Sequence, residues 1–70
     1  MAKAEIRNKI RRFRFEAGEM TQEELAERAG CTRQTIILME RSRYVPSLAL
    51  AFRIACVFGA RIEDVFEYVE

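Results

Sequence analysis

Two threonines each stand directly before a short amphipathic segment, and this arrangement limits what a chain of 70 residues can fold into. A threonine hydroxyl accepts a hydrogen bond from the free amides of a helix's first turn, so Thr21 and Thr32 predict two helix starts. The apolar spacing predicts helices over 22–29 and 33–41. Gly30 ends the first helix, because glycine adopts the left-handed backbone conformation without strain. The sequence therefore predicts two helices joined by a tight turn.

Three further helices are expected around this pair. Apolar residues at helical spacing predict a first helix over 6–17, and Ser47 caps an apolar helix over 48–58. A short helix over 62–67 is favoured by the negative charge in the first turn of that helix. The tail over 66–70 alternates like an extended segment, which would need a strand from a partner. We expect one all-α domain over the whole chain, a compact five-helix bundle with this possible short extended segment.

The size of the chain and its apolar tail predict a dimer. Half of the residues are apolar and a third are charged, as in folded globular proteins. A single core of this size supplies only about 3 to 5 kcal/mol, so association is the expected further source of stability. The last residues are too apolar for a frayed end, and we expect a dimerisation segment at about 62–70. Its contacts are expected from Val65, Phe66, Tyr68 and Val69. The alternative is that these residues only complete the core of a single chain.

The residue types exclude several other functions. The chain has no histidine to complete a zinc site, and Cys31 and Cys56 are expected to be buried as small hydrophobic residues. No serine is paired with a base and no glycine-rich phosphate loop is present, so we expect no enzyme, no metal, no cofactor and no small-molecule ligand. No stretch has the length or apolarity of a signal peptide or a membrane span, which predicts a cytoplasmic protein.

Charge is unevenly distributed although the net charge is only +1. Lys3 belongs to a basic head of six basic residues and one acidic residue in the first fourteen, whereas the last twelve carry four acidic residues and one basic residue. A solvated surface is one interpretation of the head, and a phosphate-binding surface is the other. The second predicted helix of the pair begins with Arg33, Gln34 and Thr35. These side chains suit guanine, adenine and the thymine methyl group in the major groove, so we expect them to read bases.

Three runs carry a family pattern: MTQEELAERAGCTRQTI, MERSRYVPSLALAFRIA and VFGARIEDVF. Through them the chain resembles small stand-alone members of the phage-repressor (Cro/Xre) helix-turn-helix family of transcriptional regulators, over about residues 6–66. The resemblance implies a lambda-repressor-like DNA-binding domain, with the helix-turn-helix at about 21–41. Binding to a short palindromic double-stranded operator as a homodimer follows from the same resemblance, and it would associate the protein with the nucleoid.

The resemblance also implies roles for single residues. Arg33, Gln34 and Leu38 match base-reading positions, although Leu38 offers only apolar contact. Arg14 and Glu40 match a structural ion pair, and Ser42 is expected to be left-handed where the family often has glycine. The expected phosphate contacts come from Gln22, Thr32, Arg41, Arg43 and Arg11. The alternative is a protein-interaction module, such as an antitoxin-like partner, which would use an apolar patch larger than the tail.

Overall fold

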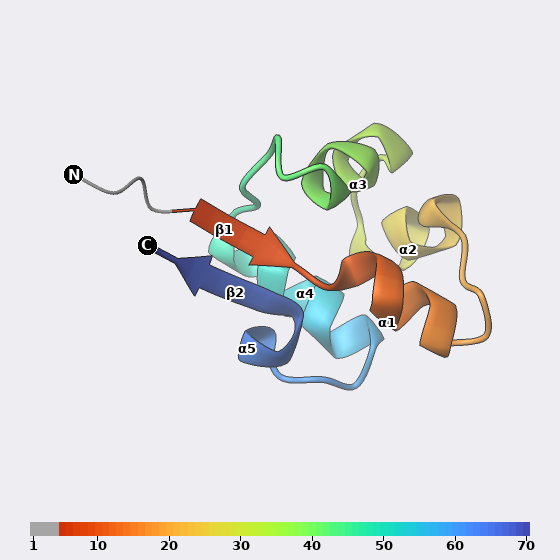
Figure 1. Cartoon of the computed structure of the whole chain (residues 1–70). Helices are drawn as coiled ribbons and strands as arrows, with labels where there is room; N and C mark the ends of the chain where they lie inside the picture. The colour runs from red at the N-terminus through yellow and green to blue at the C-terminus, as the bar shows by residue number, and fades with distance from the viewer. Residues whose placement is uncertain (1–4) are drawn as a thin grey trace.

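The computed structural model describes residues 5–70, and Lys3 of the basic head lies outside them. Five helices surround one core, and a small sheet lies along one side (Figure 1). In chain order the elements are β1 (Glu5–Asn8), α1 (Ile10–Glu16), α2 (Gln22–Ala29), α3 (Arg33–Glu40), α4 (Leu48–Val57), α5 (Ile62–Val65) and β2 (Phe66–Val69). The expectation of an all-α fold is therefore corrected to a helical bundle with a two-stranded sheet.

The sheet joins the two ends of the chain. Strand β1 runs antiparallel to β2, with Ile6 opposite Tyr68 and Asn8 opposite Phe66. The extended tail was expected to need a strand from a partner, but the chain supplies that strand itself. The first helix consequently begins at Ile10 and not at residue 6, because pairing with β2 overrides the helical spacing of the first residues.

Asn8 fixes the point where the strand becomes a helix. Its side-chain oxygen accepts a hydrogen bond from the Ile10 amide at 3.2 Å, and its side-chain amide donates to the Met39 carbonyl at 2.7 Å. The amide of Lys9 donates to the Val65 carbonyl at 2.8 Å. These bonds tie the start of α1 to the end of α3 and to α5.

The predicted helix starts at the central pair are confirmed. Thr21 accepts a hydrogen bond from the Glu24 amide at 3.0 Å, and the Glu24 carboxylate accepts one from the Thr21 amide at 3.2 Å. Thr32 accepts a hydrogen bond from the Thr35 amide at 3.2 Å. Gly30 has a φ of 74° at the end of α2, as its position predicts. Local interactions thus define the start of both helices and the turn between them.

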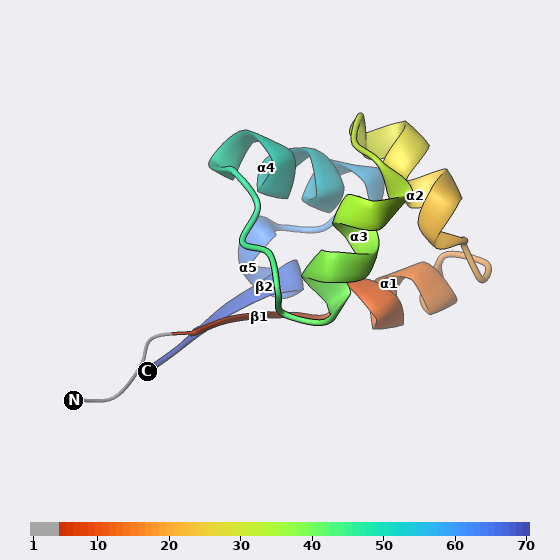
Figure 2. The same ribbon diagram turned by 90° about the horizontal axis from the view of Figure 1, so that it is seen from above.

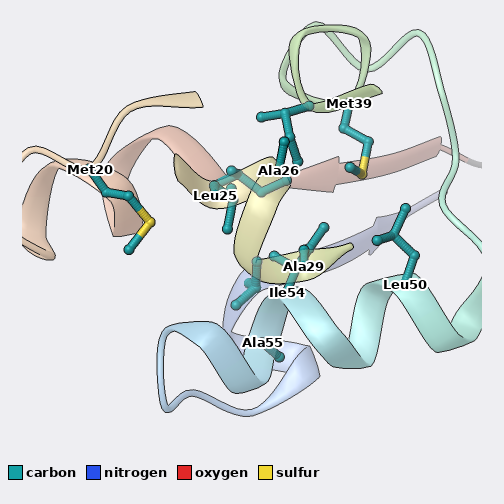
Figure 3. Close-up of a cluster of buried hydrophobic side chains, with 11 residues drawn as sticks. Met20, Leu25, Ala26, Ala29, Met39, Leu50, Ile54 and Ala55 are labelled. Carbon is teal, nitrogen blue, oxygen red and sulfur yellow. The ribbon is translucent and has the colours of Figure 1, made fainter. Parts of the chain in front are cut away.

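Buried side chains from α1, α2, α3, α4 and α5 form the core. Leu25, Ala26 and Ala29 of α2 face Met39 of α3 on one side and the buried positions of α4 on the other (Figure 3). The small alanines let α2 and α4 approach closely. These are the inward positions that the helical periodicity predicts for α2. Within residues 5–70, no helix combines the length and the apolarity that crossing a membrane requires.

The expectation for the cysteines is wrong for Cys56, which is exposed, while Cys31 is half-buried against the core. Helix α4 buries Leu50, Ala51, Ile54 and Ala55, so the side chain of Cys56 points away from the core. Burial raises the pKa of the Cys31 thiol, and the nearby Arg53 guanidinium partly opposes that rise.

Candidate nucleic-acid interface

The first turn of α3 presents polar side chains to solvent. Arg33 and Gln34 are exposed, while Thr35 is half-buried. The Thr35 hydroxyl lies 2.9 Å from the Thr32 hydroxyl, so the two side chains hold each other in place. This turn therefore has two free hydrogen-bonding side chains next to two that are fixed.

Farther along α3 the buried and accessible sides separate. Ile36 and Met39 are buried, as their helical positions predict, while Ile37 and Leu38 are half-buried. Leu38 follows Gln34 by one helical turn, so these two side chains share a stripe on the accessible side. The accessible surface of the helix is therefore polar at its start and apolar in its middle.

A groove lies between α1, the start of α2 and α3. It has a volume of about 1170 Å³ and is open to solvent. In Figure 2, α1 and α3 lie side by side, with the start of α2 near them. The groove is lined by Asn8, Lys9, Arg11, Arg12, Arg14, Phe15, Thr21, Gln22, Arg33, Ile37, Glu40 and Arg41. The fold thus brings together four of the sequence-predicted contact residues, which are Arg11, Gln22, Arg33 and Arg41.

The groove is strongly basic. Glu40 is the one acidic residue among the twelve that line it. Arg14 is paired with Glu40, and Arg12 is paired with Glu16 at 3.4 Å. Within residues 5–70, the other four basic groove residues form no ion pair: Lys9, Arg11, Arg33 and Arg41. Cations gathered in one concave surface attract phosphate groups.

The groove also contains residues that were not selected from the sequence. Lys9 and Arg12 lie in it, and so does Phe15, which is 67% exposed. The basic head pointed to this region of the chain. The sequence did not predict which side of α1 faces α3. The predicted helix began at residue 6, but this residue belongs to a strand.

Arg14, Glu40 and Gln22 form a network at the base of the groove. The Arg14 guanidinium donates to both Glu40 oxygens, at 2.7 and 3.1 Å, and to the Met20 carbonyl at 2.8 Å. The Gln22 amide nitrogen donates to Glu40 at 3.1 Å. The side chains of Arg14 and Glu40 are only 15% and 10% exposed. This shielded, two-bonded pair fixes the end of α3 against α1 and orients Gln22 at the same time.

The remaining sequence-predicted residues lie elsewhere. Arg43 is exposed on the loop between α3 and α4, outside the groove lining. Of the residues expected at a dimer contact, Val65 is buried in its own core, which leaves no side-chain surface for a partner. Phe66 packs against that core, Val69 is half-buried and Tyr68 is 61% exposed. The apolar character of the tail is thus largely explained by packing within one chain.

A family model described as helix-turn-helix matches residues 10–65. An HTH-type transcriptional regulator of Methanothermobacter thermautotrophicus is 60% identical over 62 residues, which cover 87% of this chain and 88% of the relative. One of Archaeoglobus fulgidus is 56% identical over 61 residues, or 87% and 86% of the two chains. Another, YgzD of Bacillus subtilis, is 44% identical over 61 residues, or 87% and 91%.

Proposed function

The chain belongs to the helix-turn-helix family, whose matched relatives are named transcriptional regulators, and on that premise we propose that it binds a short inverted-repeat operator as a homodimer. The family's members of this kind are DNA-binding regulators and not enzymes. The observation that carries the proposal is the exposed polar first turn of α3 beside a groove with four basic residues that form no ion pair within residues 5–70.

In this proposal, α3 reads bases in the major groove. Arg33 donates two hydrogen bonds to guanine, and Gln34 pairs with adenine. Leu38, one turn beyond Gln34, contacts a thymine methyl group, and the Thr35 methyl group does the same. Since the Thr35 hydroxyl is engaged by Thr32, the methyl group is the part of Thr35 that the DNA meets.

The phosphate contacts set the position of the protein on the duplex. Gln22 uses one amide hydrogen for Glu40, and the second hydrogen remains for a phosphate at the start of α2. Arg11 and Arg41 line the groove along which the backbone of one strand runs. Thr32 and Arg43 approach the backbone from the ends of α3.

Selection from a random duplex library, followed by affinity measurements on two variants, tests the proposal. We expect an enriched inverted repeat with half-sites about one helical turn apart. Gln34→Ala is expected to lose about 1 to 3 kcal/mol of discrimination at one base position. Arg43→Ala is expected to weaken binding to all sequences alike. Unchanged operator affinity in both variants would contradict the proposal.

The alternative is a protein-interaction module on the same fold. It predicts no enriched sequence, weak salt-sensitive DNA binding, and partner binding that does not depend on Arg33 or Gln34. The same selection experiment therefore separates the two functions.

A further inference from the structure

An uncharged surface lies at the start of α4, away from the groove. Leu48 and Phe52 of α4 are 69% and 50% exposed and lie one helical turn apart, and Val45, in the loop just before the helix, is 67% exposed. Tyr44 borders them and is also exposed. We name the surface of Val45, Leu48 and Phe52 the α4 face. Large apolar side chains gathered in this way are typical of an interaction site.

The exposure of this face follows from the packing of α4. The helix buries Leu50, Ala51, Ile54 and Ala55 against the core, which fills one side of it. Leu48 and Phe52 lie on the other side, and the exposed Cys56 continues their line by one further turn. Nothing in residues 5–70 covers this side, so the apolar surface remains open in the isolated chain.

The charges around the face limit its occupant. Residues 44–52 contain no charged residue, in a chain in which 33% of residues are charged. The next cation along the helix, Arg53, is held by the Ala29 carbonyl at 2.8 Å. The face therefore offers no contact to phosphates, unlike the basic groove. None of the three residues of the face lines the basic groove.

We infer that the α4 face docks on the α4 face of a second copy of this chain. A two-fold axis brings a patch against its own copy, so any net charge on the patch would repel itself, and a neutral apolar patch is self-complementary. The inference specifies the partner surface of the homodimer in the proposed function.

Charge placed in this face tests the inference without DNA. Leu48→Glu and Leu48→Lys should each dimerise at least about a hundredfold more weakly than the wild type in sedimentation equilibrium, because each puts like charges together in an apolar contact. Mixing the two variants should restore a dimer, because opposite charges then meet across the axis. Since Leu48 is 69% exposed, both variants should keep the circular dichroism spectrum of the wild type.

Two other exposed aromatic residues provide matched controls. Phe15→Glu on α1 and Tyr68→Glu on β2 change residues that are 67% and 61% exposed, and both variants should remain dimeric. A dimer that persists in Leu48→Glu, a dimer lost only in Tyr68→Glu, or a wild-type chain that stays monomeric overturns the inference. The first two outcomes leave the proposed homodimer and its operator intact, so they separate this inference from the proposed function. A wild-type chain that stays monomeric contradicts the proposed homodimer as well.

Discussion

Two residues other than glycine have a left-handed backbone. Glu19 precedes α2 with a φ of 58°, and Ser42 follows α3 with a φ of 57°. For a residue with a Cβ atom this conformation costs about 1 to 2 kcal/mol. The expectation that Ser42 is left-handed is confirmed. The backbone strain at Ser42 lies in the turn after α3, between Arg41 and Arg43.

Glycine at this position should stabilise the protein. Ser42→Gly removes the left-handed strain of about 1 to 2 kcal/mol but adds unfolded-state entropy of about 0.5 to 1 kcal/mol. The free energy of unfolding in urea should therefore rise by about 0.5 kcal/mol. The same substitution at Ser47, which caps α4 with ordinary backbone angles, should lower it by a few tenths. Equal effects at the two sites would show that backbone strain is not the cause.

The pair of Arg14 and Glu40 gives the second residue-scale prediction. Glu40→Ala leaves a nearly buried guanidinium without its carboxylate, so the free energy of unfolding should fall by about 3 kcal/mol. The double variant Arg14→Met with Glu40→Leu should recover most of this loss, since no unpaired charge remains. Arg12→Ala removes an exposed pair and should change stability by less than about 0.5 kcal/mol. A double variant as unstable as Glu40→Ala would argue against the unpaired charge as the cause.

At the scale of elements, the sheet and the α3 helix are coupled. Asn8 ends β1, caps the first amide of α1 and donates to a carbonyl at the end of α3. One side chain thus connects β1 and α1 with α3, which is distant in the sequence. Its two bonds fix α3 relative to α1, on either side of the basic groove.

Asn8→Ala should therefore destabilise the fold more than its exposure suggests. The substitution leaves the Met39 carbonyl and the Ile10 amide without these partners, and the free energy of unfolding should fall by about 2 kcal/mol. Arg7→Ala, on the same strand but with an exposed ion pair, should lose less than about 0.5 kcal/mol. Urea unfolding of the two variants makes the comparison, and equal losses would contradict the coupling.

At the scale of the molecule, charge separates the surface into regions. The basic groove is lined by residues of α1, α3 and the start of α2, the uncharged α4 face lies outside this lining, and β2 carries part of the acidic tail. The net charge of +1 hides this separation. A chain of this size can thus present a phosphate-binding surface and remain nearly neutral.

The groove makes a prediction for the dependence of DNA affinity on salt. Each phosphate contact contributes about one unit to the slope of log affinity against log salt concentration. Arg11→Ala should flatten this slope by about one unit per protomer and should not change which sequence is preferred. Arg61→Ala also removes one positive charge, but outside the groove, and should leave the slope unchanged. If the two variants gave the same slope, the groove would not be the phosphate site.

Local interactions explain what the sequence by itself determined. Each helix cap and turn involves residues within a few positions of one another, so it can be predicted from the sequence. This holds for the caps at Thr21, Thr32 and Ser47 and for the turn at Gly30. The inward faces of α2 and α3 followed from helical periodicity for the same reason. The helix-turn-helix and the polar start of α3 could thus be predicted.

Only the tertiary structure decided the features that depend on distant partners. Residues 5–8 form a strand because β2 pairs with them from the other end of the chain, and no local pattern encodes that pairing. Cys56 is exposed because the packing of α4 on α2 selects which apolar positions are covered in a helix that is apolar nearly all round. The groove arises where α1 meets α3, so its residues come together only when the long-range bonds of Asn8 and Arg14 form.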